Sequence, residues 1–316
     1  MAHVERAVAS PAPGRWLWGV GRWLRRKAHE ARRERWAYVF VAPTVAVFLL
    51  FRIYPALRAV QFSFMRITPR AKTWVGLANF QALLHDRTFW GAVRVSFTFS
   101  VFMVPAALAI ALLLSVLIFR LREPLSALFK GAFYLPRVAS AVVIALVWEW
   151  IYEPVFGLAN YLVGLAGIRP QLWLSDPGLA LLSLVIMELV SSQGPSLILL
   201  TAAMGSIPKE LYEAARLDGA GPVNEFFRVT LPLLRPTLLY VTVTGTINAF
   251  KFFTPIYVMT KGGPYFATNS LVYYMYELAF NRFDFGKASA VSLILFIILL
   301  VTSVAYYRLL HSQLEY

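Results

Sequence analysis

The sequence predicts an all-α membrane protein, from its composition and from six long apolar segments. Of its 316 residues, 59% are hydrophobic and only 15% are charged, which would leave too much apolar surface in water for a soluble protein. At about 1.5 Å of rise per residue, each apolar segment is long enough to cross a hydrocarbon core of roughly 30 Å. The predicted transmembrane helices lie near residues 36–63, 90–119, 131–152, 179–204, 237–260 and 287–310.

The charge and the reactive side chains exclude several classes of protein. A net charge of +14 would suggest nucleic-acid binding in a soluble protein, but here much of it falls in flanks and loops, where it sets orientation and contacts anionic lipid headgroups. We therefore expect membrane lipid and no nucleic acid as a partner. The chain has no cysteine, and its four histidines lack the spacing of metal ligands, so we expect no metal site.

Residues 1–35 form a basic tail ahead of the first apolar segment. The tail carries nine Lys and Arg residues, which rule out a membrane span. Trp16, Val20, Trp23 and Leu24 recur at helical spacing opposite Arg22, Arg25 and Arg26, a pattern typical of an amphipathic helix on a membrane surface. The alternative is a disordered basic arm. Residues 36–316 are predicted to form one six-helix transmembrane domain.

The distribution of positive charge between the loops predicts the orientation. With the N-terminus in the cytoplasm, the cytoplasmic side receives seventeen Lys and Arg residues and the other side eight. The positive-inside rule therefore places both termini, and the loop at residues 205–236, in the cytoplasm.

This loop has the pattern of a helical hairpin. Pro208 opens a short helix in which Ala214 and Ala215 form a narrow face that another protein can approach closely. Gly219 permits a tight reversal of the chain. A second helix is expected to run through Phe226, Phe227 and Val229 until Leu231-Pro232 stops it. The alternative is an amphipathic connector without a partner.

The loop also carries a motif with fixed spacing. Glu213-Ala214-Ala215 is followed by three residues, Gly219, nine residues, Val229, one residue and Leu231-Pro232. This pattern resembles the EAA loop of ABC importer permeases, in which Ile stands where this chain has Val229. Segments from about Trp36 onward, including Gly76-Leu-Ala-Asn-Phe80 and the Lys261-Gly-Gly-Pro264 loop, are similar to carbohydrate permeases of the maltose and glycerol-3-phosphate type.

The resemblance implies a type I ABC importer permease fold that forms half of a translocation pore. It implies as partners a second permease subunit, in a heterodimer, together with two ATP-binding cassette subunits and an extracytoplasmic solute-binding protein. The implied location is a bacterial or archaeal cytoplasmic membrane. In the family the hairpin docks in a groove of the ATPase. The resemblance therefore implies that the residues that couple this chain to the ATPase are Glu213, Ala214, Ala215, Asp218 and Gly219.

No ATP-binding motif of the P-loop type occurs in the chain. The most similar segment is Gly286-Lys287-Ala288-Ser289. It has Ala where the motif requires Ser or Thr after the lysine, and it lacks the first glycine of the motif at the required distance. We therefore expect no enzymatic activity in this chain and no cofactor on it, and we expect ATP and Mg²⁺ to bind on the partner ATPase.

Polar residues within two apolar segments are candidates for a substrate path, because polar groups are costly inside a membrane. They interrupt the fourth segment around Gly194-Pro195 and lie near the end of the fifth, where the resemblance places the substrate pocket. The candidates are Glu188, Ser192, Gln193, Asn248, Lys251, Phe252 and Tyr257. Lys251 departs from the amides usual at its position. It either contacts an anionic or hydroxyl-rich substrate or pairs with Glu188 in a buried salt bridge.

These observations predict a permease subunit of an ATP-driven, binding-protein-dependent importer of a sugar, either an oligosaccharide or a monosaccharide. The alternatives are an importer of glycerol 3-phosphate or another polyol, and a secondary transporter that uses an ion gradient. A secondary transporter would need ionisable residues at mid-membrane, and only Glu188 and Lys251 qualify.

Overall fold

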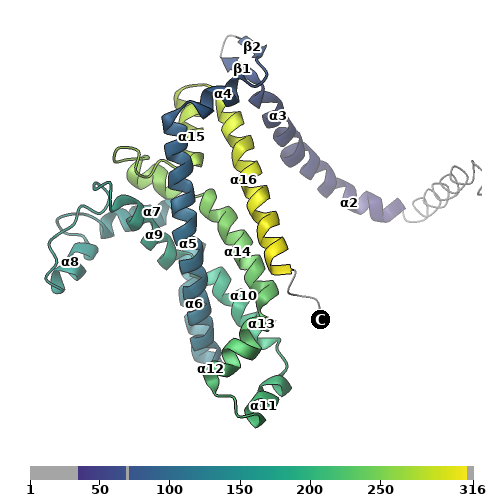
Figure 1. Ribbon diagram of the computed structural model, residues 1–316, viewed down its shortest axis with the longest axis vertical. Helices are drawn as coiled ribbons and strands as arrows, with labels where there is room; N and C mark the ends of the chain where they lie inside the picture. Colours follow the sequence, from purple (N-terminus) through teal and green to yellow (C-terminus); the bar gives the residue numbers. More distant parts are fainter. Residues whose placement is uncertain (1–34, 69–70, 312–316) are drawn as a thin grey trace, which may run out of the picture. The chain divides into compact units, whose positions relative to one another are not determined.

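The computed structural model describes residues 35–68 and 71–311 (Figure 1). The predicted amphipathic helix of the tail therefore lies outside the described residues. The chain divides after Arg58 into two compact units, and each is described by itself. In the first, helix α2 (Arg35–Phe48) leads through a π-helical turn, η1 (Leu49–Ile53), into α3 (Tyr54–Ser63), which continues into the second unit. The large apolar side chains described between Trp36 and Leu57 are not buried within this unit.

The second unit is mostly helical. Its α-helices are α4 (Ala78–Leu84), α5 (Arg87–Phe119), α6 (Glu123–Val138), α7 (Ala141–Ile151), α8 (Leu158–Leu165), α9 (Ala180–Ser191), α10 (Gln193–Gly205), α11 (Lys209–Leu217), α12 (Pro222–Glu225), α13 (Leu231–Leu233), α14 (Arg235–Phe250), α15 (Leu271–Tyr276) and α16 (Phe285–His311). Its π-helical turns are η2 (Phe226–Thr230), η3 (Ile256–Thr260) and η4 (Glu277–Asn281).

A two-stranded antiparallel hairpin corrects the prediction of a purely helical chain. Strand β1 (Met65–Thr68) pairs with β2 (Ala71–Trp74), and Met65 lies opposite Trp74. The side-chain amide of Asn79 donates to the backbone carbonyls of Ser63 and Met65, each at 2.9 Å, and so fixes the start of β1. Gly286 of α16 lies so close that a Cβ there would come within 2.1 Å of the Met65 carbonyl oxygen.

Six spans are compatible with the helices, although three of them are bent. The three helices of sufficient length and apolarity are Tyr38–Ser63, Arg87–Phe119 and Phe285–Arg308, and there are six candidates among the described residues if each bent helix pair counts as one span. The bends are 45° between α9 and α10, 68° between Pro222–Leu233 and α14, and 100° between α6 and α7.

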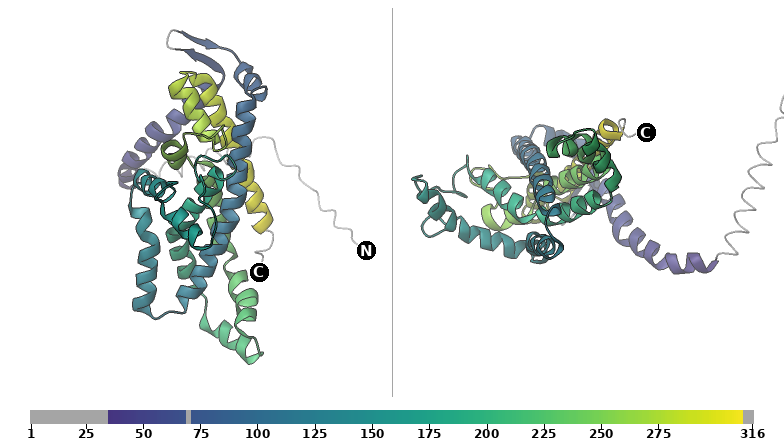
Figure 2. Two further views of the ribbon diagram at one scale, coloured as in Figure 1. Left: turned by 90° about the vertical axis from the view of Figure 1, so that its left-hand side faces the viewer. Right: turned by 90° about the horizontal axis from the view of Figure 1, so that it is seen from below.

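The prediction of one continuous helix at residues 131–152 is therefore wrong. The backbone of Ala139 and Ser140 is extended, and the Ser140 hydroxyl accepts a hydrogen bond from the amide of Val142 at 3.3 Å. Ser140 is thus the N-cap of a new helix, α7, which leaves α6 at 100°. In Figure 2, α6 and α7 can be followed by colour as two separate helices that run in different directions.

The core of the second unit forms around α5, which packs against α9, α10, α14 and α15. One buried cluster joins α5 to α9 and to the segment after α14, through residues such as Met103, Leu184 and Ile256. A second joins α5 to α15 and α16, including Phe89, Leu271 and Val291. Helix α15 and η4 were not predicted, because the sequence between residues 264 and 285 reads as a connection with turn residues.

The two hairpins lie at opposite ends of the second unit. Figure 1 shows β1 and β2 at one end and the helices α11 and α12 at the other, and the left view of Figure 2 agrees. The helices between them run roughly along the long axis of the unit. This arrangement suits a chain whose helical hairpin and strand hairpin face opposite sides of a membrane.

Candidate functional site

The helical hairpin of residues 209–233 turns at Gly219, which has a φ of +82°. The amide of Gly219 donates to the carbonyl of Arg216 at 3.0 Å, and the amide of Ala220 donates to that of Ala215 at 2.9 Å. These two bonds form a Schellman motif that ends α11 and satisfies its last carbonyls. A residue in this left-handed conformation is strained unless it is glycine, so the turn depends on Gly219.

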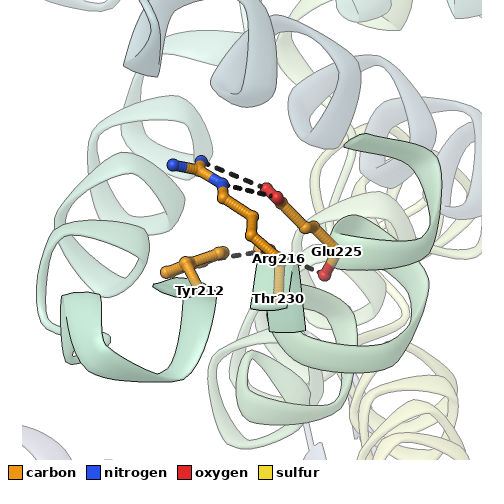
Figure 3. A network of polar contacts seen from close by, with 4 residues as sticks. All are labelled: Tyr212, Arg216, Glu225 and Thr230. Atoms are coloured by element: carbon orange, nitrogen blue, oxygen red, sulfur yellow. Dashed lines mark hydrogen bonds and ion pairs between the residues drawn. The ribbon is translucent and has the colours of Figure 1, made fainter. Parts of the chain in front are cut away.

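Two polar contacts join the arms of this hairpin (Figure 3). Arg216 of α11 forms an ion pair with Glu225 of α12, with Nε 2.7 Å from Oε1 and Nη2 3.4 Å from Oε2. One turn earlier in α11, the hydroxyl of Tyr212 lies 3.0 Å from the hydroxyl of Thr230. Thr230 is buried, and its hydroxyl also donates to the backbone carbonyl of Glu225 at 3.4 Å. The arms are thus connected at two levels.

The ion pair changes the acid–base properties of both side chains. The hydrogen bond from Arg216 lowers the pKa of Glu225 below its ordinary value, because it stabilises the carboxylate. The same bond raises the pKa of Arg216 above its ordinary value. The pair is therefore charged throughout the physiological pH range.

The second arm of the hairpin continues past Leu231-Pro232, where the sequence predicted its end. Helix α12 runs through η2 and α13 to Leu233, and the bend comes at Leu234. In η2 the amide of Leu231 donates to the carbonyl of Phe226, five residues back, so the helix is widened just before Pro232. The wider turn accommodates the proline, which lacks an amide hydrogen.

The hairpin is attached to the bundle by a small apolar cluster and presents its turn to solvent. Met204 at the end of α10, Ile207 and Leu234 are buried together at its base. A cavity of about 750 Å³ lies between the hairpin and the ends of α5 and α10. Of the predicted coupling residues, Ala215 is half-buried, and the exposed ones are Glu213, Ala214, Asp218 and Gly219.

A second cavity, of about 620 Å³, lies among α5, α6, α9, α10 and α14, and we call it the central cavity. Six of the predicted substrate-path residues line it, although they come from two segments about 60 residues apart in sequence: Glu188, Ser192, Gln193, Asn248, Lys251 and Phe252. The structure thus brings the fourth and fifth apolar segments together at one site.

Tyr257, the seventh predicted residue, does not line the central cavity. It lies in η3 and packs in an aromatic cluster, with its ring 5.5 Å from that of Phe253 and 5.2 Å from that of Tyr276. The helix predicted to continue to residue 260 ends at Phe250, so Tyr257 does not share a helix with Asn248. Phe252 does line the cavity, but it is mostly buried, stacked on Phe99 with the ring centres 4.4 Å apart.

A helix break at Ser192 positions the polar groups of the central cavity. Ser192 ends α9 and begins α10. The side-chain amide of Gln193 donates to the carbonyl of Leu189 at 2.7 Å, which fixes the orientation of the amide. Gln193 is 3% exposed, and its Oε1 has no hydrogen-bond partner in the structure. Gly194 follows directly, and a Cβ there would lie 2.6 Å from Tyr134 Cα, so α10 and α6 touch at the backbone.

Three charged side chains line the central cavity. Lys251 is exposed at the C-cap of α14, and Glu188 of α9 is half-buried. In the described part of the chain, no ion pair within 4.0 Å joins them, so the structure does not contain the salt bridge that the sequence left as one explanation of Lys251. Arg137 of α6 is the third, and sequence analysis missed it. The sequence did contain a signal for Arg137, because it is a basic residue within the apolar segment at residues 131–152.

A family model and two relatives resemble this chain. The model described as "binding-protein-dependent transport system inner membrane component" matches residues 75–313. The arabinooligosaccharides transport system permease protein AraP of Bacillus subtilis is 32% identical over 274 residues, which are 84% of this chain and 85% of AraP. The sn-glycerol-3-phosphate transport system permease protein UgpA of Salmonella typhimurium is 30% identical over 290 residues, covering 90% and 97%.

Solved structures show the same fold. A bacterial ABC transporter involved in the import of the acidic polysaccharide alginate contains a chain that matches with a TM-score of 0.81 and 22% identity, over 92% of this chain and all of that one. An alginate ABC transporter in complex with an alginate pentasaccharide-bound periplasmic protein matches with a TM-score of 0.79 and 22% identity, over 89% and 95% of the two chains.

Proposed function

Because the chain belongs to the family of binding-protein-dependent transport system inner membrane components, we propose that it is the permease subunit of an ATP-driven importer of a sugar. The observation that carries the proposal is the family match over residues 75–313, since it includes both the helical hairpin and the central cavity. AraP serves arabino-oligosaccharides and the alginate transporter an acidic polysaccharide, which supports a carbohydrate substrate.

The proposed transporter contains further subunits. A solute-binding protein delivers the sugar, as the complex of the alginate transporter with a periplasmic protein suggests. A second permease subunit completes the pore, and two ATPase subunits supply the energy, because this sequence has no P-loop. We place the chain in the inner membrane, with both termini and the helical hairpin in the cytoplasm on the basis of its positive loops.

In this proposal the helical hairpin transmits the motion of the ATPase to the central cavity. Its exposed turn, including Glu213 and Asp218, docks on the ATPase. Its two ends continue into α10 and α13–α14, and both α10 and α14 line the cavity. The buried contact of Met204 with Leu234 joins these two ends. A displacement of the hairpin therefore moves two walls of the cavity together, as alternating access requires.

An importer of glycerol 3-phosphate or another polyol is the second candidate function. UgpA is 30% identical over nearly the whole chain, and its substrate carries a phosphate. Two cations, Arg137 and Lys251, line the central cavity and would suit such a group. A secondary transporter remains the weaker alternative, because it leaves the family match without an explanation.

Uptake by the reconstituted complex tests the proposal. The full-length chain is purified with its co-purifying subunits, placed in proteoliposomes with the solute-binding protein, and assayed for ATP-dependent uptake. The variant combining Glu213→Ala with Gly219→Asp is expected to remain inserted and to lose uptake while ATP hydrolysis persists. Glu210→Ala, which changes an exposed glutamate one turn earlier in α11, is the control and should transport normally. Normal uptake by the double variant would refute the coupling role, and uptake without ATP would favour a secondary transporter.

A further inference from the structure

The central cavity holds an excess of positive charge. Arg137 and Lys251 are the basic residues that line it, and Glu188 is the acidic one. The structure contains no ion pair within 4.0 Å between Glu188 and either cation, all three being described residues. One carboxylate can neutralise at most one of the two cations, so the cavity has a net charge of at least +1 when all three are ionised.

An ionised side chain within a membrane segment costs free energy, and the structure offsets that cost only in part. Lys251 caps the C-terminus of α14, where the free carbonyls and the helix dipole stabilise a cation. Its side chain is nevertheless exposed to the cavity rather than bonded to a neighbour. Ionisable residues within membrane segments mark substrate pathways because they pair with the solute that passes. Glu188 interacts electrostatically with Arg137, so an anionic group is the complement that Lys251 lacks.

A polar residue at the wall of the cavity keeps one atom without a partner. Gln193 lines the cavity at the helix break, is 97% buried, and has an Oε1 atom with no hydrogen bond. Since its Nε2 is held by the Leu189 carbonyl, the free atom is an acceptor. This acceptor is closed off from the cavity in the structure, so the hydroxyl-binding group that the cavity presents is another amide. Asn248, exposed in the same cavity, adds an amide with both donor and acceptor atoms.

We propose that the central cavity binds an acidic saccharide, a solute that combines several hydroxyl groups with a carboxylate or a phosphate. Its hydroxyl groups bond to Asn248, and its anionic group is bound by Lys251 and Arg137. The inference rests on the proposed function, because it names the class of solute that the importer moves through this cavity. It adds that an uncharged sugar of the same size leaves Lys251 unpaired and is bound more weakly.

Three matched probes test this specificity: D-glucose, D-glucuronate and glucose 6-phosphate, which differ only at carbon 6. Binding of each to the full-length chain, purified with its co-purifying subunits in nanodiscs, is measured by saturation-transfer NMR without the solute-binding protein. At least one anionic probe is expected to bind about tenfold more tightly than glucose at low salt, and the better of the two identifies the carboxylate or the phosphate as the favoured group. The preference should decline at high salt.

Variants assign the preference to the central cavity. Lys251→Gln and Arg137→Gln should each reduce it several-fold, whereas Arg169→Gln, which removes an exposed cation outside the cavity, should leave it unchanged. Asn248→Ala should weaken all three probes alike. Equal binding of the three probes, no detectable binding of either anionic one, or a preference that survives both cation substitutions would overturn the proposal. Failure of the proposed function appears instead as absent ATP-dependent uptake, which this binding assay does not measure.

Discussion

The guanidinium of Arg216 lies 2.7 Å from the carboxylate of Glu225 and joins the two arms of the helical hairpin across its turn. Both side chains are in contact with water, so the pair contributes little to global stability. Its effect is local. Together with the contact between Tyr212 and Thr230, the pair holds α11 at a defined angle to α12. The pair is therefore a positioning device for the surface proposed to receive the ATPase.

The first prediction concerns the coupling role of this pair. Arg216→Ala and Glu225→Gln should each lower the ratio of transported solute to hydrolysed ATP several-fold, because the orientation of α11 becomes less defined. The midpoint of thermal inactivation should change little. Uptake and ATP hydrolysis measured in the same proteoliposomes give the ratio. In a double-mutant cycle the two substitutions should be non-additive. Strict additivity would show that the pair does not act as a unit.

The second prediction is the pH dependence of this effect. Because Arg216 lowers the pKa of Glu225, the pair is complete above the ordinary glutamate pKa of about 4.3 and is lost only as pH falls through the lower folded value. The difference in coupling ratio between wild type and Glu225→Gln should therefore be constant from about pH 8 to about pH 5 and disappear in stronger acid. A difference that already declines near pH 6 would assign the effect to another group.

The third prediction concerns the turn of the hairpin. Gly219→Val places a β-branched residue at a φ of +82°, which costs about 1–2 kcal/mol. A Cβ at Gly219 meets no atom within 4 Å, so the cost is conformational rather than steric. Gly219→Asn, whose side chain tolerates this conformation, is the control. We expect uptake to fall strongly in the valine variant and mildly in the asparagine variant. Equal losses would point to a direct contact of Gly219 with the ATPase.

The fourth prediction compares two helical glycines. Gly286→Ala forces the Met65 carbonyl away, because the new Cβ would come within 2.1 Å of that oxygen. The expected cost is about 1–3 kcal/mol, seen as a lower midpoint of thermal inactivation in detergent. Gly91→Ala, in α5 with no atom within 4 Å of the new Cβ, should be neutral or raise the midpoint, because alanine favours the helix. A similar midpoint for the two variants would contradict the close approach of α16 to β1.

The fifth prediction concerns the start of α5. Asp86 accepts from the Thr88 amide at 2.7 Å as the N-cap, and it accepts from the Tyr274 hydroxyl of α15 at 2.6 Å. Asp86→Ala loses both bonds and should cost about 1–2 kcal/mol. Tyr274→Phe loses only one and should cost less, while Asp86→Asn keeps the cap and serves as the control. A midpoint of thermal inactivation that falls further in Asp86→Ala than in Tyr274→Phe would support both hydrogen bonds of Asp86. A larger fall in Tyr274→Phe would contradict them.

The sequence predicted the parts of the fold that depend on local patterns. The apolar length of α5 and α16 and the turn at Gly219 follow from residue type and spacing, and the interruption expected around Gly194-Pro195 occurs two residues earlier, at Ser192. The sequence did not reveal the 100° bend after α6, because Ser140 is a helix cap only when the chain packs so that Ala139 is extended. In the same way, Pro232 predicts a helix end unless a wide turn precedes it.

The central cavity was predicted in part. The polar residues of the fourth and fifth segments stood out as costly in a membrane, and the structure places Gln193 and Lys251 in one cavity. The sequence predicts a helix that continues to residue 152, and such a helix does not show that Arg137 lies in the last turn of α6. Tyr257 was included because α14 was expected to extend beyond Phe250. Both errors have the same cause, a helix end that only tertiary contacts determine.

The backbone contact at Gly194 determines which kind of motion can open the central cavity. A virtual Cβ of Gly194 would lie 2.6 Å from Tyr134 Cα and 2.7 Å from the Phe133 carbonyl oxygen, so α10 and α6 are in backbone contact and sliding would disrupt that contact. Shear motion, in which packed helices glide over one another, is thereby disfavoured at this interface. For the proposed transport cycle we therefore expect hinge rotation, in which α6 and α10 turn together and the bends at their ends absorb the change in backbone angle.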